Sequence, residues 1–289
     1  MIKITDVRAC PSDSAFLIDD GEAAVLIDTG FAFTGERVAD NITNTLGDRE
    51  LDYIFLTHSH YDHALGAPYV KERYPNAKVV AGEYAARIFS KESARATMRE
   101  LDRKFAVISG VSEYRDLIDD LSVDITVSDG DIITAGQMDF IACAFPGHTK
   151  CSFGFYLKER KLLVASETIG IYDGDKAILP SFLAGYEMTL SSIRRAASMD
   201  IDNILLAHFG VLDRVHTKYF LSNAENAARE SAEEILAILS SGKTKEDAVK
   251  YIKDKFYHGR IKEVYPPDAM ELNTSISVAL VEKELLATE

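Results

Sequence analysis

The strongest constraint on this chain is a dense run of metal-binding side-chain types at positions 57–67, with the sequence THSHYDHALGA. Three histidines and one aspartate fall within six residues, after an apolar strand predicted over 51–56 and before a helix predicted over 64–74. Imidazole and carboxylate are the ligand types that zinc and iron take in proteins. The run therefore predicts a metal site, against the alternative of a polar surface loop.

The spacing within this run divides its ligands between two ions. Side chains two positions apart in an extended segment project to the same face, so we expect His58 and His60 to hold one ion. As the chain turns into the helix, Asp62 and His63 point towards a second ion. An acidic side chain is also favourable in the first turn of a helix.

Two further histidines occupy the ends of predicted strands. His148 follows a strand predicted over 138–145, and His208 follows one predicted over 203–207. A lone histidine at a strand end is commonly a hydrogen-bonded core residue, but the first cluster favours a ligand role for both. His216 and His258 fall in predicted helical or linker segments, and we expect neither to bind metal.

These segments resemble the successive motifs of the metallo-β-lactamase superfamily. The matching runs are Leu26-Ile27-Asp28-Thr29-Gly30, His58-x-His60-x-Asp62-His63, Gly147-His148-Thr149 and Ala207-His208-Phe209-Gly210. The resemblance covers roughly residues 14–210 and is specific, because separate motifs occur in the familiar order. It implies an α/β fold of four layers, the αββα sandwich, with a dimetal site at one edge of its two sheets.

The resemblance also implies a role for each ligand. His58, His60 and His148 would hold the first metal ion. Asp62, His63 and His208 would hold the second. Asp28 would order the loop that presents the ligands rather than bind metal, against the alternative of a plain turn residue after a strand.

One position departs from the family pattern. Most dimetal members carry a bridging aspartate between the last two histidine motifs, whereas this chain has Glu167, nineteen residues after His148. Glutamate offers the same carboxylate on one more methylene, so we expect Glu167 to be a ligand. Asp173 or Asp175, in the turn that follows, are the alternatives. The change leaves open that one metal site is weak, empty or tuned to iron.

The implied activity is hydrolysis by a dimetal enzyme. Two divalent ions, zinc in the first place with iron or manganese as alternatives, would share a bridging hydroxide that attacks a small-molecule ester, thioester or lactone. Asp62 would accept the proton of the nucleophile. The glyoxalase II-like and lactonase branches fit this activity. The alternatives are an iron-containing oxidoreductase of the same fold acting on oxygen, nitric oxide or sulfur compounds, a phosphodiesterase, and a metal-stabilised protein without turnover.

The organisation predicted is a catalytic domain over 1–215, with a helical insert at about 83–121, and a helical C-terminal extension over 216–289. Insert and extension could roof the pocket or form a homodimer interface. Tyr172 and Tyr186 are candidate substrate-binding residues, although ordinary half-buried packing is the simpler interpretation of both. Cys151, three residues after His148, could approach the site, but a small-hydrophobe role is favoured.

Composition narrows the partners and the compartment. A net charge of −14 repels phosphate backbones, so we expect a small-molecule substrate and no nucleic acid. No apolar run is long enough to span a membrane and no secretory leader is visible, so no membrane partner is expected. Three unpatterned cysteines favour reduced thiols and a cytoplasmic protein.

Overall fold

The structure is a computed structural model that describes residues 2–286, and it divides into two compact units. Of the described residues, unit 1 comprises 2–144 and 151–160, and unit 2 comprises 145–150 and 161–286. The predicted boundary between a catalytic domain and a helical extension at residue 215 stays a prediction.

Unit 1 is built on a mixed sheet with the strand order β1-β2-β3-β4-β5-β6. Its strands are β1 (Lys3–Asp6), β2 (Phe16–Asp19), β3 (Ala24–Ile27), β4 (Tyr53–Leu56), β5 (Lys78–Gly82) and β6 (Ile125–Val127). The first three pair antiparallel, and β3 to β6 pair parallel. β2 and β3 form an antiparallel hairpin through the turn at Asp20-Gly21, where the Asp20 carboxylate accepts the backbone N–H of Ala23 at 2.8 Å. Because β3 and β4 are parallel, the residues that follow them emerge at the same edge.

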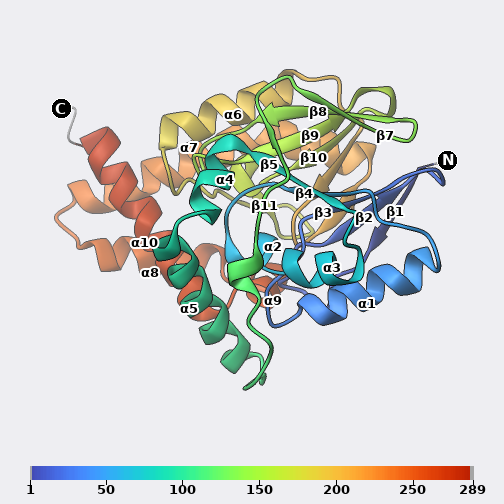
Figure 1. Cartoon of the computed structure of the whole chain (residues 1–289). Helices are drawn as coiled ribbons and strands as arrows, with labels where there is room; N and C mark the ends of the chain where they lie inside the picture. The colour runs from blue at the N-terminus through green and yellow to red at the C-terminus, as the bar shows by residue number, and fades with distance from the viewer. Residues whose placement is uncertain (1, 287–289) are drawn as a thin grey trace. The chain divides into compact units, whose positions relative to one another are not determined.

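A second β layer of unit 1 packs on the first. It is an antiparallel ribbon of β7 (Ile132–Ala135), β8 (Met138–Ala144) and β9 (Phe153–Leu157). Phe55 of β4 touches Phe140 and Phe155 of the ribbon at ring-centroid distances of 5.0 and 4.5 Å. The ribbon lies on one side of the first sheet, with α1 and α3 on the other (Figure 1).

The helices of unit 1 each bury some of their side chains. They are α1 (Gly35–Leu46), α2 (Tyr61–Ala64), α3 (Ala67–Arg73), α4 (Glu83–Phe89) and α5 (Glu92–Ile108), with a short 3-10 turn η1 (Ile118–Asp120). Val38, Ile42 and Leu46 are all buried on α1, and the helix ends at Gly47, whose φ of +63° suits glycine. The insert predicted at about 83–121 is helical as far as Ile108 and irregular over 111–117.

The single helix predicted over 64–74 is wrong, because the chain breaks between α2 and α3 at Leu65 and Gly66. A Cβ at Gly66 would lie 1.9 Å from the carbonyl oxygen of Thr29. The backbone N–H of Gly66 donates to the carbonyl of Gly30 at 3.1 Å. The break therefore lets the segment after the histidines lie directly against the loop that follows β3.

Unit 2 carries its own strands and helices. β10 (Leu162–Ala165) pairs parallel with β13 (Asn203–Leu206), which pairs antiparallel with β14 (Gly210–Leu212). β11 (Ile171–Tyr172) and β12 (Ile178–Leu179) form a small hairpin after the 3-10 turn η3 (Glu167–Ile169). α6 (Tyr186–Ser198) packs on α7 (Arg214–Ser240), and α7 contacts β12, β13 and β14.

The C-terminal part of unit 2 is helical, as predicted. After α7 come α8 (Lys245–Phe256), α9 (Gly259–Val264), α10 (Pro267–Val281) and a last turn, η4 (Glu282–Leu286). The apolar stripe of α7 is a packing face, because Ala224, Ala228, Ala232 and Ile235 are buried. The sequence did not predict α9. Among residues 2–286, no helix is both long and apolar enough to cross a bilayer.

Asp102, buried on α5, ties this helix to the loop after β3. It accepts hydrogen bonds from the backbone N–H of Ala32 at 2.9 Å and from the Tyr114 hydroxyl at 2.5 Å. The ring of Phe105, on the same helix, stacks on Phe31 at 4.6 Å. Burial raises the pKa of Asp102 from 3.8 to about 6, against the opposing effect of the two hydrogen bonds.

We expect Asp102→Asn to change how stability depends on pH. The folded carboxyl holds its proton more tightly than the unfolded one, so this group lowers the free energy of unfolding as pH rises from about 4 to about 6. The stability of the wild type relative to Asp102→Asn should fall by on the order of 3 kcal/mol across that window. Urea unfolding of metal-free protein at each pH measures it, with exposed Asp48→Asn as the control. Parallel pH profiles for wild type and Asp102→Asn would contradict the assignment.

Candidate metal centre

In unit 1 the histidine run sits where the sequence analysis places it, at the carboxyl end of β4 and the start of α2. The ring of His58 lies 4.6 Å from that of His60 and 4.0 Å from that of His63, measured between centroids. His63 Nε2 lies 3.7 Å from Asp62 Oδ2. His58 and His63 are buried, whereas His60 and Asp62 are partly exposed. The four predicted ligands of this unit are thus brought into one cluster.

Asp28, at the end of β3, holds this cluster in place. Its carboxylate lies 2.7 Å from His63 Nδ1, and it accepts the backbone N–H of Thr57 at 2.8 Å and the hydroxyl of Ser14 at 2.9 Å. The hydroxyl of Thr57 donates to both Asp28 oxygens and lies 3.1 Å from His58 Nδ1. The Asp28 side chain therefore ties together the loop that carries the histidine run. Its φ of +54° is uncommon for a residue other than glycine.

The contact with Asp28 also orients His63. With Nδ1 turned to the carboxylate, the ring directs Nε2 the opposite way, towards the Asp62 side chain. Histidines that bind metal commonly donate their other ring N–H to a carboxylate, which fixes both tautomer and ring orientation. Three imidazoles packed this closely, with carboxylates on two sides, suit a cation in their midst.

Cys151 belongs to unit 1 and lies beside the loop of the histidine run. Its thiol donates to the Ser59 hydroxyl at 3.2 Å, and the side chain is buried. Ser59 stands between His58 and His60, so the thiol touches the loop through a neighbour of two predicted ligands. Burial of this kind fits the small-hydrophobe role that the sequence favours.

In unit 2 the predicted ligands His148 and His208 both lie beside the third, Glu167. Glu167 follows β10 and His208 follows β13, and these parallel strands end at one edge. Glu167 Oε2 lies 2.9 Å from His148 Nε2, and Oε1 lies 3.5 Å from His208 Nε2. The side chain of Glu167 is 3% exposed.

The alternatives to Glu167 are placed differently. Asp173 accepts the backbone N–H groups of Asp175 and Ala177 at 2.9 and 3.0 Å, which is the behaviour of a turn residue. Asp175 is exposed. Of these three carboxylates, Glu167 is the one that the structure joins to His148 and His208.

His148 is positioned by the loop around it. Ser181 places its hydroxyl 2.6 Å from His148 Nδ1, and the backbone N–H of His148 donates to the Thr168 hydroxyl at 3.2 Å. A Cβ at Gly147, where φ is +147°, would lie 2.3 Å from the Thr189 hydroxyl oxygen. The ring of His148, like that of His63, thus has Nδ1 on a structural partner and Nε2 towards a carboxylate.

The remaining candidate side chains lie elsewhere. His216 pairs with Asp213 at 2.8 Å on the surface, and exposed His258 contacts the carbonyl of Lys255. The buried Tyr172 hydroxyl donates to the carbonyl of Asp175 at 2.5 Å, and the buried Tyr186 ring packs on Phe182. Burial raises the pKa of both tyrosines.

The sequence analysis missed several side chains that contact predicted ligands. The hydroxyl of Tyr265 donates to Glu167 Oε1, Ser181 contacts His148, and Arg260 donates to the backbone carbonyls of His208 and Phe209. Tyr265 and Arg260 lie at the end of α9 and within it, far along the chain from the ligands. No local pattern in the sequence marks them.

Comparison with known proteins gives a family match and a distant relative. Residues 10–208 match the family model of the metallo-beta-lactamase superfamily, which is more than half of the chain. A hydroxyacylglutathione hydrolase from Brucella ovis is 25% identical over 219 residues, covering 68% of this chain and 71% of the relative.

Solved structures show the same fold at lower identity. A metallo-beta-lactamase family protein from Thermus thermophilus has a TM-score of 0.64 at 17% identity, covering 93% of this chain and 88% of that one. An archaeal superfamily protein from Sulfolobus tokodaii has a TM-score of 0.57 at 20% identity, covering 74% and 81%. The αββα fold class predicted from the sequence is confirmed.

We expect Asp28→Asn to weaken zinc binding about 10- to 100-fold, because removal of the partner that orients a histidine ligand has an effect of this size. Zinc affinity measured by competition with a chromophoric chelator tests this. Asp13→Asn is the matched control, since Asp13 is also buried in unit 1 but accepts from Thr34 and nearby backbone N–H groups. Equal zinc affinity in Asp28→Asn and wild type would refute the orienting role.

Proposed function

The chain belongs to the metallo-β-lactamase superfamily and is a metal-dependent hydrolase, and we propose that it cleaves small-molecule thioesters or the related esters and lactones at a two-metal centre. The observation that carries the proposal is the set of imidazoles and carboxylates that each unit brings together, four side chains in unit 1 (His58, His60, Asp62 and His63) and three in unit 2 (His148, Glu167 and His208).

We propose that one ion is held by His58, His60 and His148 with Glu167, and the second by Asp62, His63 and His208. Glu167 lies against both His148 and His208, which supports a bridging role for its two oxygens. The donor set of imidazole nitrogens and carboxylate oxygens fits zinc, and iron and manganese also accept it.

A pair of divalent cations would lower the pKa of a shared water and polarise the substrate carbonyl. The chain's own contribution is positioning and proton transfer. Asp62 is the more exposed of the two proposed carboxylate ligands, at 15% against 3% for the Glu167 side chain. We assign it the proton that the attacking water loses. In thioester hydrolysis that water adds to the carbonyl carbon, the carbon–sulfur bond breaks, and the leaving sulfur takes the proton to give a thiol and an acid.

The choice of thioester is supported by the Brucella relative, whose name is that of a hydrolase of hydroxyacyl-glutathione. A net charge of −14 disfavours polyanionic substrates such as nucleic acid. The sequence has three cysteines in no recognisable pattern, which supports a reducing compartment such as the cytoplasm. A homodimer formed through the C-terminal helices stays a prediction.

We expect His60→Ala to lower kcat/KM for a thioester by about 100-fold or more, a loss of about 3 kcal/mol of transition-state stabilisation. The fold should survive, because His60 is partly exposed whereas His58 and His63 are buried. The control is His216→Ala, which removes an exposed histidine paired with Asp213. Full activity in His60→Ala, with circular dichroism unchanged, would remove His60 from the site.

Metal content and a substrate panel separate the proposed hydrolase from its alternatives. We expect two equivalents of zinc in protein made without added metal, together with turnover of a hydroxyacyl-glutathione thioester. The panel also includes a lactone and a phosphodiester. Iron with a visible absorption band and no hydrolysis would replace the proposal with the oxidoreductase alternative. Turnover of the phosphodiester alone would replace the substrate class.

A further inference from the structure

Tyr265 connects the C-terminal helices of unit 2 to a proposed metal ligand. It follows α9 directly, and its hydroxyl donates a hydrogen bond to Glu167 Oε1 across 98 residues of sequence. Its ring meets that of His208 edge-on, with centroids 6.0 Å apart. The side chain is buried, so this contact is made inside the protein. A segment outside all the family motifs therefore touches two of the proposed ligands.

The two oxygens of Glu167 are not equivalent. Oε2 is the oxygen beside His148, at 2.9 Å, whereas Oε1 is the oxygen beside His208, at 3.5 Å. The Tyr265 hydroxyl donates to Oε1. The hydrogen bond from Tyr265 therefore restrains the carboxylate oxygen that lies beside His208.

Tyr265 is itself firmly held. Its backbone N–H donates to the carbonyl of Ile261 at 3.0 Å, and its own carbonyl accepts the Tyr257 hydroxyl at 3.0 Å. On α9, directly before Tyr265, Arg260 donates to the carbonyls of His208 and Phe209 at 3.1 and 3.0 Å, and its guanidinium lies 4.3 Å from the Phe209 ring centroid. The segment 260–265 therefore contacts two segments that carry predicted ligands, those of Glu167 and His208.

The loop of His208 needs such support. Its φ of +58° lies in the left-handed region, which costs a residue other than glycine on the order of 1–3 kcal/mol. Glu167 needs it for another reason. A glutamate has one more rotatable bond than the aspartate usual at this position, so an unrestrained carboxylate would sample more orientations.

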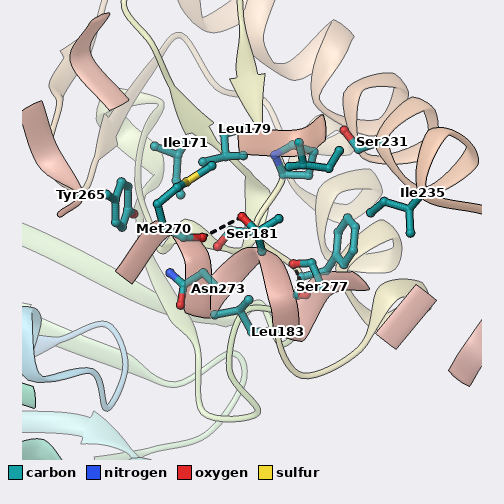
Figure 2. A pocket seen from close by; sticks show the side chains of 14 residues that line it. Ile171, Leu179, Ser181, Leu183, Ser231, Ile235, Tyr265, Met270, Asn273 and Ser277 are labelled. Atoms are coloured by element: carbon teal, nitrogen blue, oxygen red, sulfur yellow. Dashed lines mark hydrogen bonds between the residues drawn. The ribbon is translucent and has the colours of Figure 1, made fainter. Parts of the chain in front are cut away.

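A small pocket lies beside the ring of Tyr265. Tyr265 and Met270 lie on one side of a pocket and Ser231 and Ile235 on the other, with Ser181 between them (Figure 2). The cavity measures about 30 Å³, enough for a water molecule or two. A cavity of this volume is too small for a substrate. On this side the buried Tyr265 phenol therefore contacts no substrate and serves to hold neighbouring groups in place.

We propose that Tyr265 is a positioning residue that fixes Glu167 Oε1 for the ion on the His208 side, so that the C-terminal helices govern the loading of one metal position. The inference rests on the proposed function, in which Glu167 and His208 hold metal. Loss of the hydroxyl removes the restraint on Oε1 and leaves Oε2 beside His148 as it is. The two metal positions should therefore respond unequally.

The test is a zinc titration of metal-free Tyr265→Phe, using a chromophoric chelator to obtain two dissociation constants. Phenylalanine keeps the ring against His208 and removes only the hydroxyl. We expect the constant of one position to rise about 10- to 100-fold and the other to stay near the wild-type value. Titrations of His148→Ala and His208→Ala identify which constant belongs to which position. Tyr219→Phe is the matched control, since its hydroxyl donates to the carbonyl of Lys176 away from the ligands.

Equal constants in Tyr265→Phe and wild type would overturn the proposal, and so would an equal weakening of both positions or a weakening confined to the His148 side. Urea unfolding of the metal-free variant checks that the fold is intact. The two proposals fail separately. A wild type that binds fewer than two ions refutes the two-metal centre, whereas a wild type that binds two and hydrolyses thioester, with Tyr265→Phe identical to it, refutes only the positioning role.

Discussion

The Asp28 carboxylate is the interaction on which the ligand cluster of unit 1 depends. It joins the end of β3 to the end of β4 through Thr57, and it joins both to α2 through His63. A buried carboxylate is costly unless hydrogen bonds satisfy it, and here donors from three segments do so. The same contacts that stabilise the charge fix the tautomer of His63 and the course of the loop. Loss of the Asp28 carboxylate would therefore also remove the contacts that position His63 and the loop of the histidine run.

Parallel strands explain why the ligands could be found in the sequence. Residues that follow neighbouring parallel strands emerge at one edge, and this brings Asp28 to the His58 loop in unit 1 and Glu167 to His208 in unit 2. Each ligand is therefore marked locally, by an apolar run that ends in an imidazole or a carboxylate. The preference for Glu167 over Asp173 rested on the same rule, and the turn contacts of Asp173 agree with it.

What the sequence did not show are the features set by contacts distant along the chain. The break at Gly66 depends on the carbonyl of Thr29, which lies close only after β3 and β4 have paired. Asp28 and His208 adopt left-handed backbone conformations without being glycines, so nothing in the sequence indicates these conformations. Tyr172 and Tyr186 were the candidate tyrosines because they follow the ligand motifs closely. Tyr265 contacts Glu167 instead, and its distance along the chain hid it.

The glutamate at position 167 gives these distant contacts a common reason. An added methylene moves the carboxylate further from its backbone and lets it turn more freely, so holding a glutamate in one orientation costs more conformational entropy than holding an aspartate. In this protein His148 and His208 lie beside one oxygen each, and Tyr265 donates to the oxygen beside the more distant histidine. Glu167, the departure from the family pattern, and its contact with Tyr265 are then parts of one arrangement. In it Tyr265, which lies outside the family motifs, holds the carboxylate of the longer side chain.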